Sequence, residues 1–158
     1  MSRTILVTGA SGFLGANLVR ELLSCGHAVR AFVRPSANTS TLRDVVDDID
    51  LRFGSLLDER AIRRATEGID AIMHAAGAVG LRVDWATATR DTLEGTRALL
   101  AAAEANGVER LVMACPWLTS PSDALSDGAR SSRVRHWTQS PWLWAAHLAH
   151  VEALHAAA

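Results

Sequence analysis

The chain has 158 residues, a formal net charge of −1, and 49% hydrophobic and 21% charged residues. A chain of this length buries roughly two thirds of its unfolded surface, so we expect one compact domain rather than a disordered protein. The balanced charge gives no support for a nucleic-acid partner. The N-terminal sequence MSRTILVTGASG turns to glycine after a few apolar residues, which excludes a signal peptide or membrane span there and makes a cytoplasmic protein the expectation.

Two residue types with catalytic uses are absent. All sixteen basic residues are arginine, and the sequence contains neither lysine nor tyrosine. These 158 residues therefore cannot supply a lysine for a Schiff base, nor a tyrosine phenol to act as an acid. The two cysteines, Cys25 and Cys115, are too few for a disulfide framework and have no metal-ligand spacing around them. We predict that both are buried apolar residues and that the chain holds no metal.

Apolar runs alternate with helical patterns along the chain. The runs predict five strands, at 5–8, 28–33, 50–53, 71–74 and 110–114. Leucine, valine and alanine at helical spacing predict helices between them, at 17–25, 42–46, 58–66 and 85–105. This alternation predicts an α/β fold, a doubly wound parallel sheet of about five strands in the order 3-2-1-4-5. Right-handed crossovers place helices on both of its faces.

The composition changes after the fifth predicted strand. Residues 116–140 are rich in serine, aspartate, glycine, proline and arginine without periodicity, which predicts a long loop. Pro141 follows Ser140, a suitable cap, and begins a predicted last helix at 141–156. No internal repeat and no second domain is visible, so residues 1–158 are predicted to form a single dinucleotide-binding domain.

The segment TGASGFLG lies where the first strand passes into the first helix. In that context Gly9 permits a tight turn, Gly12 lets the backbone approach a pyrophosphate, and Gly15 lets the helix pack closely on the strand. The helix N-terminus adds N–H donors and a partial positive charge. The sequence therefore predicts a dinucleotide site. The alternative is a glycine turn kept only for packing, which would not explain all three positions.

The residue about twenty positions after this turn bears on the choice of dinucleotide. An acid there receives the ribose hydroxyls of NAD, whereas an arginine there faces the additional phosphate of NADP. This chain has Arg34, followed by Ser36 and, farther on, Arg43. We therefore favour NADP over NAD as the cofactor. The alternative is that Arg34 is an ordinary solvated charge.

Five segments that together span nearly the whole chain follow a familiar pattern: TGASGFLG, AFVRPSANTSTL, GIDAIMHAAG, LEGTRALLAAAEANGVERLVM and SPWLWAAHLAHVEAL. Through these segments the sequence resembles the extended short-chain dehydrogenases, including the dihydroflavonol-reductase-like and sugar-epimerase-like (NAD-dependent epimerase/dehydratase) members. The resemblance implies a cofactor-binding set made of Gly9, Ser11, Gly12, Phe13, Leu14, Gly15, Arg34, Ser55, Leu56, Ala75, Ala76 and Gly77.

Within that set the resemblance implies different contacts. Residues 11–14 would lie against the pyrophosphate, Arg34 near the adenosine 2′-phosphate, and residues 75–77 beside the nicotinamide ribose. Ser55 and Leu56 fall where the family commonly has an Asp-Leu pair that contacts adenine, so the aspartate is missing here. His74, at the end of the fourth strand, is interpreted as a core histidine in preference to a functional one.

The catalytic positions depart from the family pattern. The family uses a serine or threonine after the fifth strand, a tyrosine that transfers the proton, and a lysine four residues later. The serine run reads Ala114, Cys115, Pro116 here, the tyrosine and lysine positions match Trp142 and Ala146, and the asparagine before Gly-Thr is Thr92. Standard redox chemistry of the family is therefore not expected. Family members also continue well beyond this length, so we expect a truncated chain without a substrate lobe, either a natural short form or a fragment.

Two functions remain open from the sequence. The first is a non-catalytic nucleotide-binding or partner subunit. Because family members often dimerise through a four-helix interface, a homodimer would use helices 85–105 and 141–156. The second is an enzyme with altered, possibly non-redox chemistry on a small molecule in the same cleft. Its weak catalytic candidates are Cys115, His147 and His150. A third possibility, a relic without selected function, predicts poor folding or no dinucleotide binding.

Overall fold

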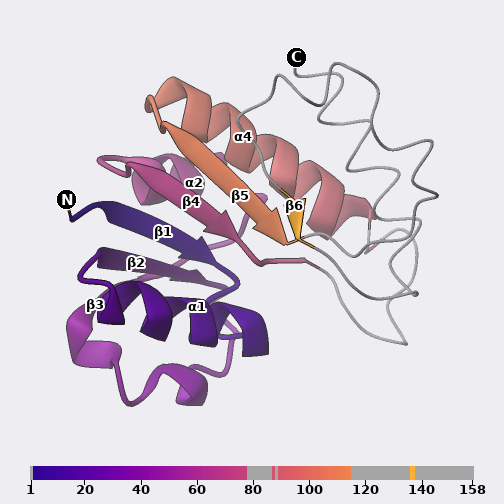
Figure 1. The fold of residues 1–158 in the computed structure, drawn as a ribbon. Helices are drawn as coiled ribbons and strands as arrows, with labels where there is room; N and C mark the ends of the chain where they lie inside the picture. The colour runs from indigo at the N-terminus through magenta and orange to yellow at the C-terminus, as the bar shows by residue number, and fades with distance from the viewer. Residues whose placement is uncertain (1, 78–86, 88, 115–135, 138–158) are drawn as a thin grey trace.

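The structure is a computed structural model and describes residues 2–77, 87, 89–114 and 136–137. Within these residues six strands form one parallel sheet in the order β3-β2-β1-β4-β5-β6 (Figure 1). The strands are β1 (Thr4–Thr8), β2 (Ala28–Val33), β3 (Ile49–Phe53), β4 (Ala71–His74), β5 (Arg110–Ala114) and β6 (His136–Trp137). The α/β class and the predicted order of the first five strands are confirmed.

The sixth strand lies inside the stretch predicted as a loop at 116–140. His136 and Trp137 pair in parallel with Met113 and Ala114 at the end of β5, so the loop prediction was wrong at these two residues. A pairing of two residues leaves no alternating pattern in the sequence, which is why periodicity could not reveal it. The rest of 116–140, and the helix predicted at 141–156, lie outside the described residues.

The helices begin and end close to the predicted positions, with three differences. Helix α1 (Phe13–Ser24) begins directly after Gly12, four residues before the apolar pattern predicted. The helix predicted at 42–46 is instead two short 3₁₀ turns, η1 (Ser40–Leu42) and η2 (Val46–Asp48). Helix α2 (Glu59–Thr66) agrees with its prediction. The long helix predicted at 85–105 has a π-helical turn, η3 (Thr89–Glu94), before α4 (Gly95–Ala105).

Cys25 also differs from its prediction. It is the C-cap residue that follows α1, and it is exposed rather than buried. The buried face of α1 consists of Gly15, Ala16, Val19 and Leu22, a spacing that does not include Cys25. Among the described helices, none combines the length and the hydrophobicity that crossing a bilayer requires.

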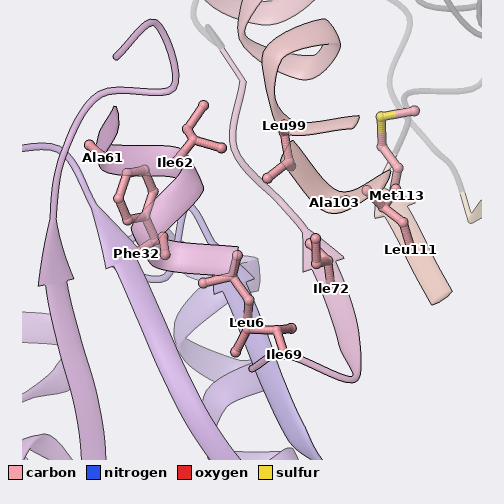
Figure 2. Packing of buried hydrophobic residues seen from close by; sticks show 11 residues of the cluster. Leu6, Phe32, Ala61, Ile62, Ile69, Ile72, Leu99, Ala103, Leu111 and Met113 are labelled. Carbon is pink, nitrogen blue, oxygen red and sulfur yellow. The ribbon is translucent and has the colours of Figure 1, made fainter. Parts of the chain in front are cut away.

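Helices cover the sheet on both faces, α1 and η1 on one and α2 and α4 on the other (Figure 1). The alternation of β1 sends Ile5 and Val7 toward α1, and Leu6 toward α2 and α4. Figure 2 shows the cluster on the second face, where Leu6 and Ile72 of the sheet lie with Ile62 and Leu99 of the helices. This packing fixes the carboxyl ends of β1, β2 and β4 beside one another.

A charged cluster ties the edge of the sheet to α2. Arg30 Nε donates to Asp50 Oδ2 at 2.7 Å, and Arg52 Nε donates to Asp50 Oδ1 at 2.6 Å. Arg30 Nη1 also donates to the carbonyl oxygens of Ala65 and Glu67, which lie at the C-terminal end of α2. Burial raises the pKa of the Asp50 carboxyl, but the hydrogen bonds and charges of Arg52 and Arg30 outweigh it, so this pKa lies below its ordinary value.

We expect Asp50→Asn to lower the free energy of unfolding by about 0.5–1 kcal/mol at pH 7, a partly screened ion-pair value. Because folding lowers the pKa of Asp50, its contribution is complete above the unfolded value of about 3.9 and is lost as the pH falls through the folded value. The difference between wild type and variant should thus shrink below pH 4. Urea unfolding at pH 7 and pH 3 measures it. Asp47→Asn, an exposed acid without an ion pair in the described residues, is the control.

Candidate functional site

The glycine turn, residues 9–15, connects β1 to α1 and packs on the segment that follows β4. Gly9 has a φ of +68°, and a Cβ atom there would lie 2.7 Å from both the Ala75 carbonyl oxygen and the Ala76 nitrogen. A Cβ atom on Gly15 would overlap the Gly9 carbonyl group, with Ala10 Cα at 2.8 Å. The chain's own backbone therefore requires glycine at both positions, as the predicted tight turn and close helix–strand packing imply.

Gly12 is different, because the described residues crowd it far less than they crowd Gly9 and Gly15. Its φ of −78° and ψ of 168° are ordinary extended values that any residue adopts. The nearest atom to an added Cβ is the Gly9 carbonyl oxygen at 3.3 Å, and apart from Ser11 and Phe13 no other described residue places a heavy atom within 4 Å of it. A turn kept only for packing accounts for Gly9 and Gly15 but leaves Gly12 without a reason.

The N-terminus of α1 has no side-chain cap. Gly12 is its N-cap residue and has no side chain to accept a hydrogen bond, and the first turn carries no acid. The first N–H groups of a helix have no intrahelical acceptor and carry a partial positive charge. Phe13 is 89% exposed and Leu14 is 46% exposed at this point. An anion with apolar neighbours fits this surface.

Arg34 directly follows β2, the strand that lies beside the glycine turn. Thr8 pairs with Phe32 in the register of β1 and β2, so Arg34 comes just after the position that faces Gly9. Arg34 and Arg43 are exposed, and neither forms an ion pair within the described part of the chain. An anion placed between the turn and β2 would meet no competing carboxylate on Arg34.

The loop that follows Arg34 is fastened to the turn by contacts that the sequence did not indicate. Thr41 Oγ1 donates to the Ser11 carbonyl oxygen at 2.9 Å, and Arg20 Nη2 donates to the Thr41 carbonyl oxygen at 2.6 Å. Arg20 also pairs with Asp44, which lowers the pKa of the Asp44 carboxyl and raises that of the guanidinium. The position of the loop relative to the turn is thus set by contacts across more than twenty residues, which leave no local pattern.

Ser55 and Leu56 follow β3 and are held by the protein itself. Ser55 Oγ accepts a hydrogen bond from the Leu57 N–H at 3.1 Å, which leaves its O–H as a donor. Leu56 is partly buried against the core, and a Cβ atom on Gly95 would lie 3.0 Å from Leu56 Cβ. The Leu56 side chain therefore packs against α4.

His74 lies at the end of β4 and is 2% exposed, as expected of a core histidine. Its Nδ1 is 2.6 Å from Thr8 Oγ1, and its Nε2 is 3.0 Å from Thr96 Oγ1. Thr96 Oγ1 in turn lies 2.6 Å from the Thr92 carbonyl oxygen. A Cβ atom added to Gly77 would lie 3.8 Å from Thr92 Oγ1, so η3 borders the segment after β4. The sequence did not indicate these threonine partners.

The predicted residues thus divide into two groups. The glycine turn, Arg34 and residues 75–77 come together at the carboxyl edge of β1, β2 and β4, where ligands bind in open α/β sheets. The catalytic candidates Cys115, His147 and His150, and the positions Trp142 and Ala146, lie outside the described residues. Within the described ranges no three His, Cys, Asp or Glu side chains gather as a metal site would require.

Comparison with known proteins identifies the family. The sequence model of the NAD-dependent epimerase/dehydratase family matches residues 5–115, well over half of the chain. The chain belongs to this family. The match includes the glycine turn, Arg34 and the ends of β4 and β5. Its membership agrees with the resemblance seen in the sequence and with the strand order.

Two curated relatives illustrate how far the likeness extends. "Sterol demethylase protein B" of Methylococcus capsulatus is 39% identical over 140 residues, which cover 88% of this chain and 40% of the relative. A "3-beta-hydroxysteroid dehydrogenase" of Mycolicibacterium neoaurum is 39% identical over 119 residues, covering 68% of this chain and 30% of the relative. The chain therefore spans 40% or less of the length of these two relatives.

Solved structures show the same partial overlap. A short-chain dehydrogenase/reductase superfamily protein of Agrobacterium tumefaciens, solved with NAD bound, has a TM-score of 0.66 at 28% identity. That match covers 96% of this chain and 44% of the other. A dTDP-glucose 4,6-dehydratase of Streptomyces venezuelae, solved with NAD and TYD, has a TM-score of 0.63 at 31% identity, covering 70% and 38%. Both relatives hold NAD.

Proposed function

We propose that this family member binds NADP, and NAD less tightly, at the glycine turn, and serves as a non-catalytic nucleotide-binding or partner subunit. The observation that carries the proposal is the presence of glycine at position 12. Its backbone angles suit any residue, and a Cβ atom there would have one close neighbour among the described residues, whereas close approach of a pyrophosphate requires glycine. The NAD held by two related structures supports the same ligand class.

In this proposal, different residues at the carboxyl edge of β1, β2 and β4 contact different parts of the dinucleotide. The N–H groups at residues 11–14 would hold the pyrophosphate, with Gly9 and Gly15 shaping the turn. Arg34 would pair with the adenosine 2′-phosphate, and Ser55 and Leu56 would border the adenine. Ala75, Ala76 and Gly77 would lie beside the nicotinamide ribose. When bound, the nicotinamide supplies a hydride donor or acceptor, and this chain's residues supply binding and orientation.

The non-catalytic part of the proposal rests on side chains. None of the 158 residues is a tyrosine or a lysine, and Trp142 and Ala146 match their family positions. An indole has no phenolic proton, and alanine has no charge with which to tune a neighbouring acid. The test is isothermal titration with NADP and NAD, together with a search for hydride transfer by absorbance. Binding without turnover supports the proposal, whereas hydride transfer by the purified chain refutes the non-catalytic role.

The alternative is an enzyme with altered chemistry, and the names of the relatives favour it. They are a sterol demethylase protein and a hydroxysteroid dehydrogenase, which suggests an apolar small-molecule substrate. The groups available to such an enzyme are Cys115, His147 and His150. If turnover of a candidate substrate is found, its loss in Cys115→Ala or His147→Ala would support this function, and unchanged turnover in both would eliminate these two groups.

The partner-subunit role includes a homodimer through helices 85–105 and 141–156. Helix α4 buries Thr96, Leu99 and Ala103 against its own sheet and leaves the small side chain of Ala101 exposed on the opposite side. Small residues allow a second helix to approach closely. Sedimentation at micromolar concentration tests this proposal, and a monomer alone would remove it.

Arg34→Ala is expected to weaken NADP binding by about tenfold or more and to leave NAD binding unchanged. The reason is that a guanidinium–phosphate contact is a charge-assisted hydrogen bond, worth about 1.5–3 kcal/mol. Titration of both dinucleotides measures the effect. Arg64→Ala, which removes an exposed arginine on α2, is the control and should change neither affinity. Tighter binding of NAD than of NADP by the wild type would overturn the NADP preference.

A further inference from the structure

A chain of buried polar groups crosses the face of the sheet that α2 and α4 cover. Thr8 and Thr96 are 0% exposed, His74 is 2% exposed and Thr92 is 8% exposed. The rest of this face is the apolar cluster that contains Leu6, Ile72 and Leu99. Burying polar groups among apolar ones costs free energy unless each is hydrogen-bonded, so the arrangement of this polar chain is constrained.

The hydrogen bonds of the polar chain run in one direction. The Thr96 hydroxyl donates to the Thr92 carbonyl oxygen, so its oxygen accepts from the N–H at His74 Nε2. With the ring proton assigned to Nε2, His74 Nδ1 accepts from the Thr8 hydroxyl. The His74 ring therefore links β1 to α4.

His74 also joins the three segments that border the candidate site. Thr8 immediately precedes Gly9, and the Ala75 N–H donates to the Thr8 carbonyl oxygen at 3.1 Å. Ala75 and Ala76 form the surface on which Gly9 packs. At the other end of the polar chain, Thr92 belongs to η3 and borders Gly77. The glycine turn, residues 75–77 and η3 are thus connected through one imidazole ring.

We propose that His74 is a positioning residue that fixes the spacing between the glycine turn and η3 and thereby sets the affinity for the dinucleotide. The inference rests on the proposed function, because it assigns a role within the same site. Thr8, His74 and Thr96 are buried, so none of them touches a ligand on the surface. Any effect of these side chains on binding therefore acts through the position of the turn and of η3.

The test breaks the polar chain at each end with the isosteric variants Thr8→Val and Thr96→Val. The probe is whichever of NADP and NAD the wild type binds more tightly, and affinity is measured by titration on folded protein. Each variant should bind about three- to tenfold more weakly, the size of one lost hydrogen bond. Because either break releases the same connection, the double variant should bind no more weakly than the weaker single variant.

Three further variants separate positioning from general stability. Thr66→Val removes the hydroxyl that accepts from Asn106 Nδ2 at 2.7 Å, between α2 and the end of α4, and should lower the melting temperature without changing affinity. Thr96→Ser keeps the hydroxyl and should retain wild-type affinity. The asparagine of His74→Asn is long enough to hydrogen-bond to Thr8 but too short to reach Thr96. This variant should therefore bind the dinucleotide as Thr96→Val does, and it replaces Thr96→Val if Thr96→Val does not fold.

The outcomes distinguish this inference from the proposed function. If the wild type binds neither dinucleotide, the proposed function is wrong and the inference fails with it. If the wild type binds and Thr96→Val binds equally well, only the inference is overturned, and His74 is then a structural residue. Independent, multiplying losses in the double variant would also overturn it, since the two threonines would then act separately.

Discussion

Gly9→Ala is expected to destabilise the fold by about 2–5 kcal/mol. Two costs combine in this value. A residue with a side chain at a φ of +68° is strained by roughly 1–2 kcal/mol, and crowding a packed site adds about 1–3 kcal/mol. The crowding partners are the Ala75 carbonyl oxygen and the Ala76 nitrogen, both 2.7 Å from the new Cβ, and backbone atoms cannot rotate away. Urea unfolding followed by tryptophan fluorescence measures the loss.

The chain offers a matched control for this change. Gly26 has a φ of +78°, but a Cβ atom there has no neighbour within 4 Å. Gly26→Ala should therefore incur only the backbone strain, roughly 1–2 kcal/mol, and the excess in Gly9→Ala measures the crowding against the segment after β4. Equal losses in the two variants would mean that the turn moves away from Ala75 at little cost, contrary to the packing described above.

The parts of the fold that the sequence predicted are those with repeated local signals. β2, β4 and β5 begin and end at the predicted residues, and β1 and β3 differ by one residue, because short apolar runs bounded by turn residues mark buried parallel strands. The errors lie where the pattern is short or not α-helical. The two 3₁₀ turns at 40–42 and 46–48 replace a predicted helix, and η3 replaces the first described turns of another.

The candidate site was predictable to the extent that its residues form a local motif. The glycine turn and Arg34 were found because the spacing of glycines after a strand has a specific physical meaning. Thr8, Thr41 and Thr96 were missed because each acts through a partner more than twenty residues away, and a threonine in a strand or helix has no distinguishing pattern. Such contacts follow from the register of β1 with β4 and from the docking of α4, which only the assembled fold fixes.

The register of β1 with β4 also explains why the shape of the glycine turn depends on residues buried beneath it. Thr8 pairs with His74 in the sheet, so the residues that follow them, Gly9 and Ala75, leave their strands side by side. Gly9 packs so closely on Ala75 that there is no room for a side chain, and the Thr8–His74 hydrogen bond holds that pair of strand ends together. The shape of the turn on the surface thus depends on polar groups beneath it.

Gly12→Ala is expected to have the opposite profile to Gly9→Ala. Its backbone angles suit any residue and its Cβ would meet only the Gly9 carbonyl oxygen at 3.3 Å, so the free energy of unfolding should change by no more than about 1 kcal/mol. Dinucleotide affinity should fall by about 100-fold, because the added methyl group displaces the pyrophosphate from the N–H groups at the start of α1, and each charge-assisted bond is worth about 1.5–3 kcal/mol.

Titration and urea unfolding on the same preparation separate the two interpretations of the turn. If Gly12 serves a ligand, its variant loses affinity while keeping stability, and Gly26→Ala keeps its affinity despite losing some stability. If the turn serves packing alone, Gly12→Ala binds the dinucleotide as the wild type does. That second result would remove the observation on which the proposed function rests, since Gly12 is the glycine of the turn that the described residues crowd least.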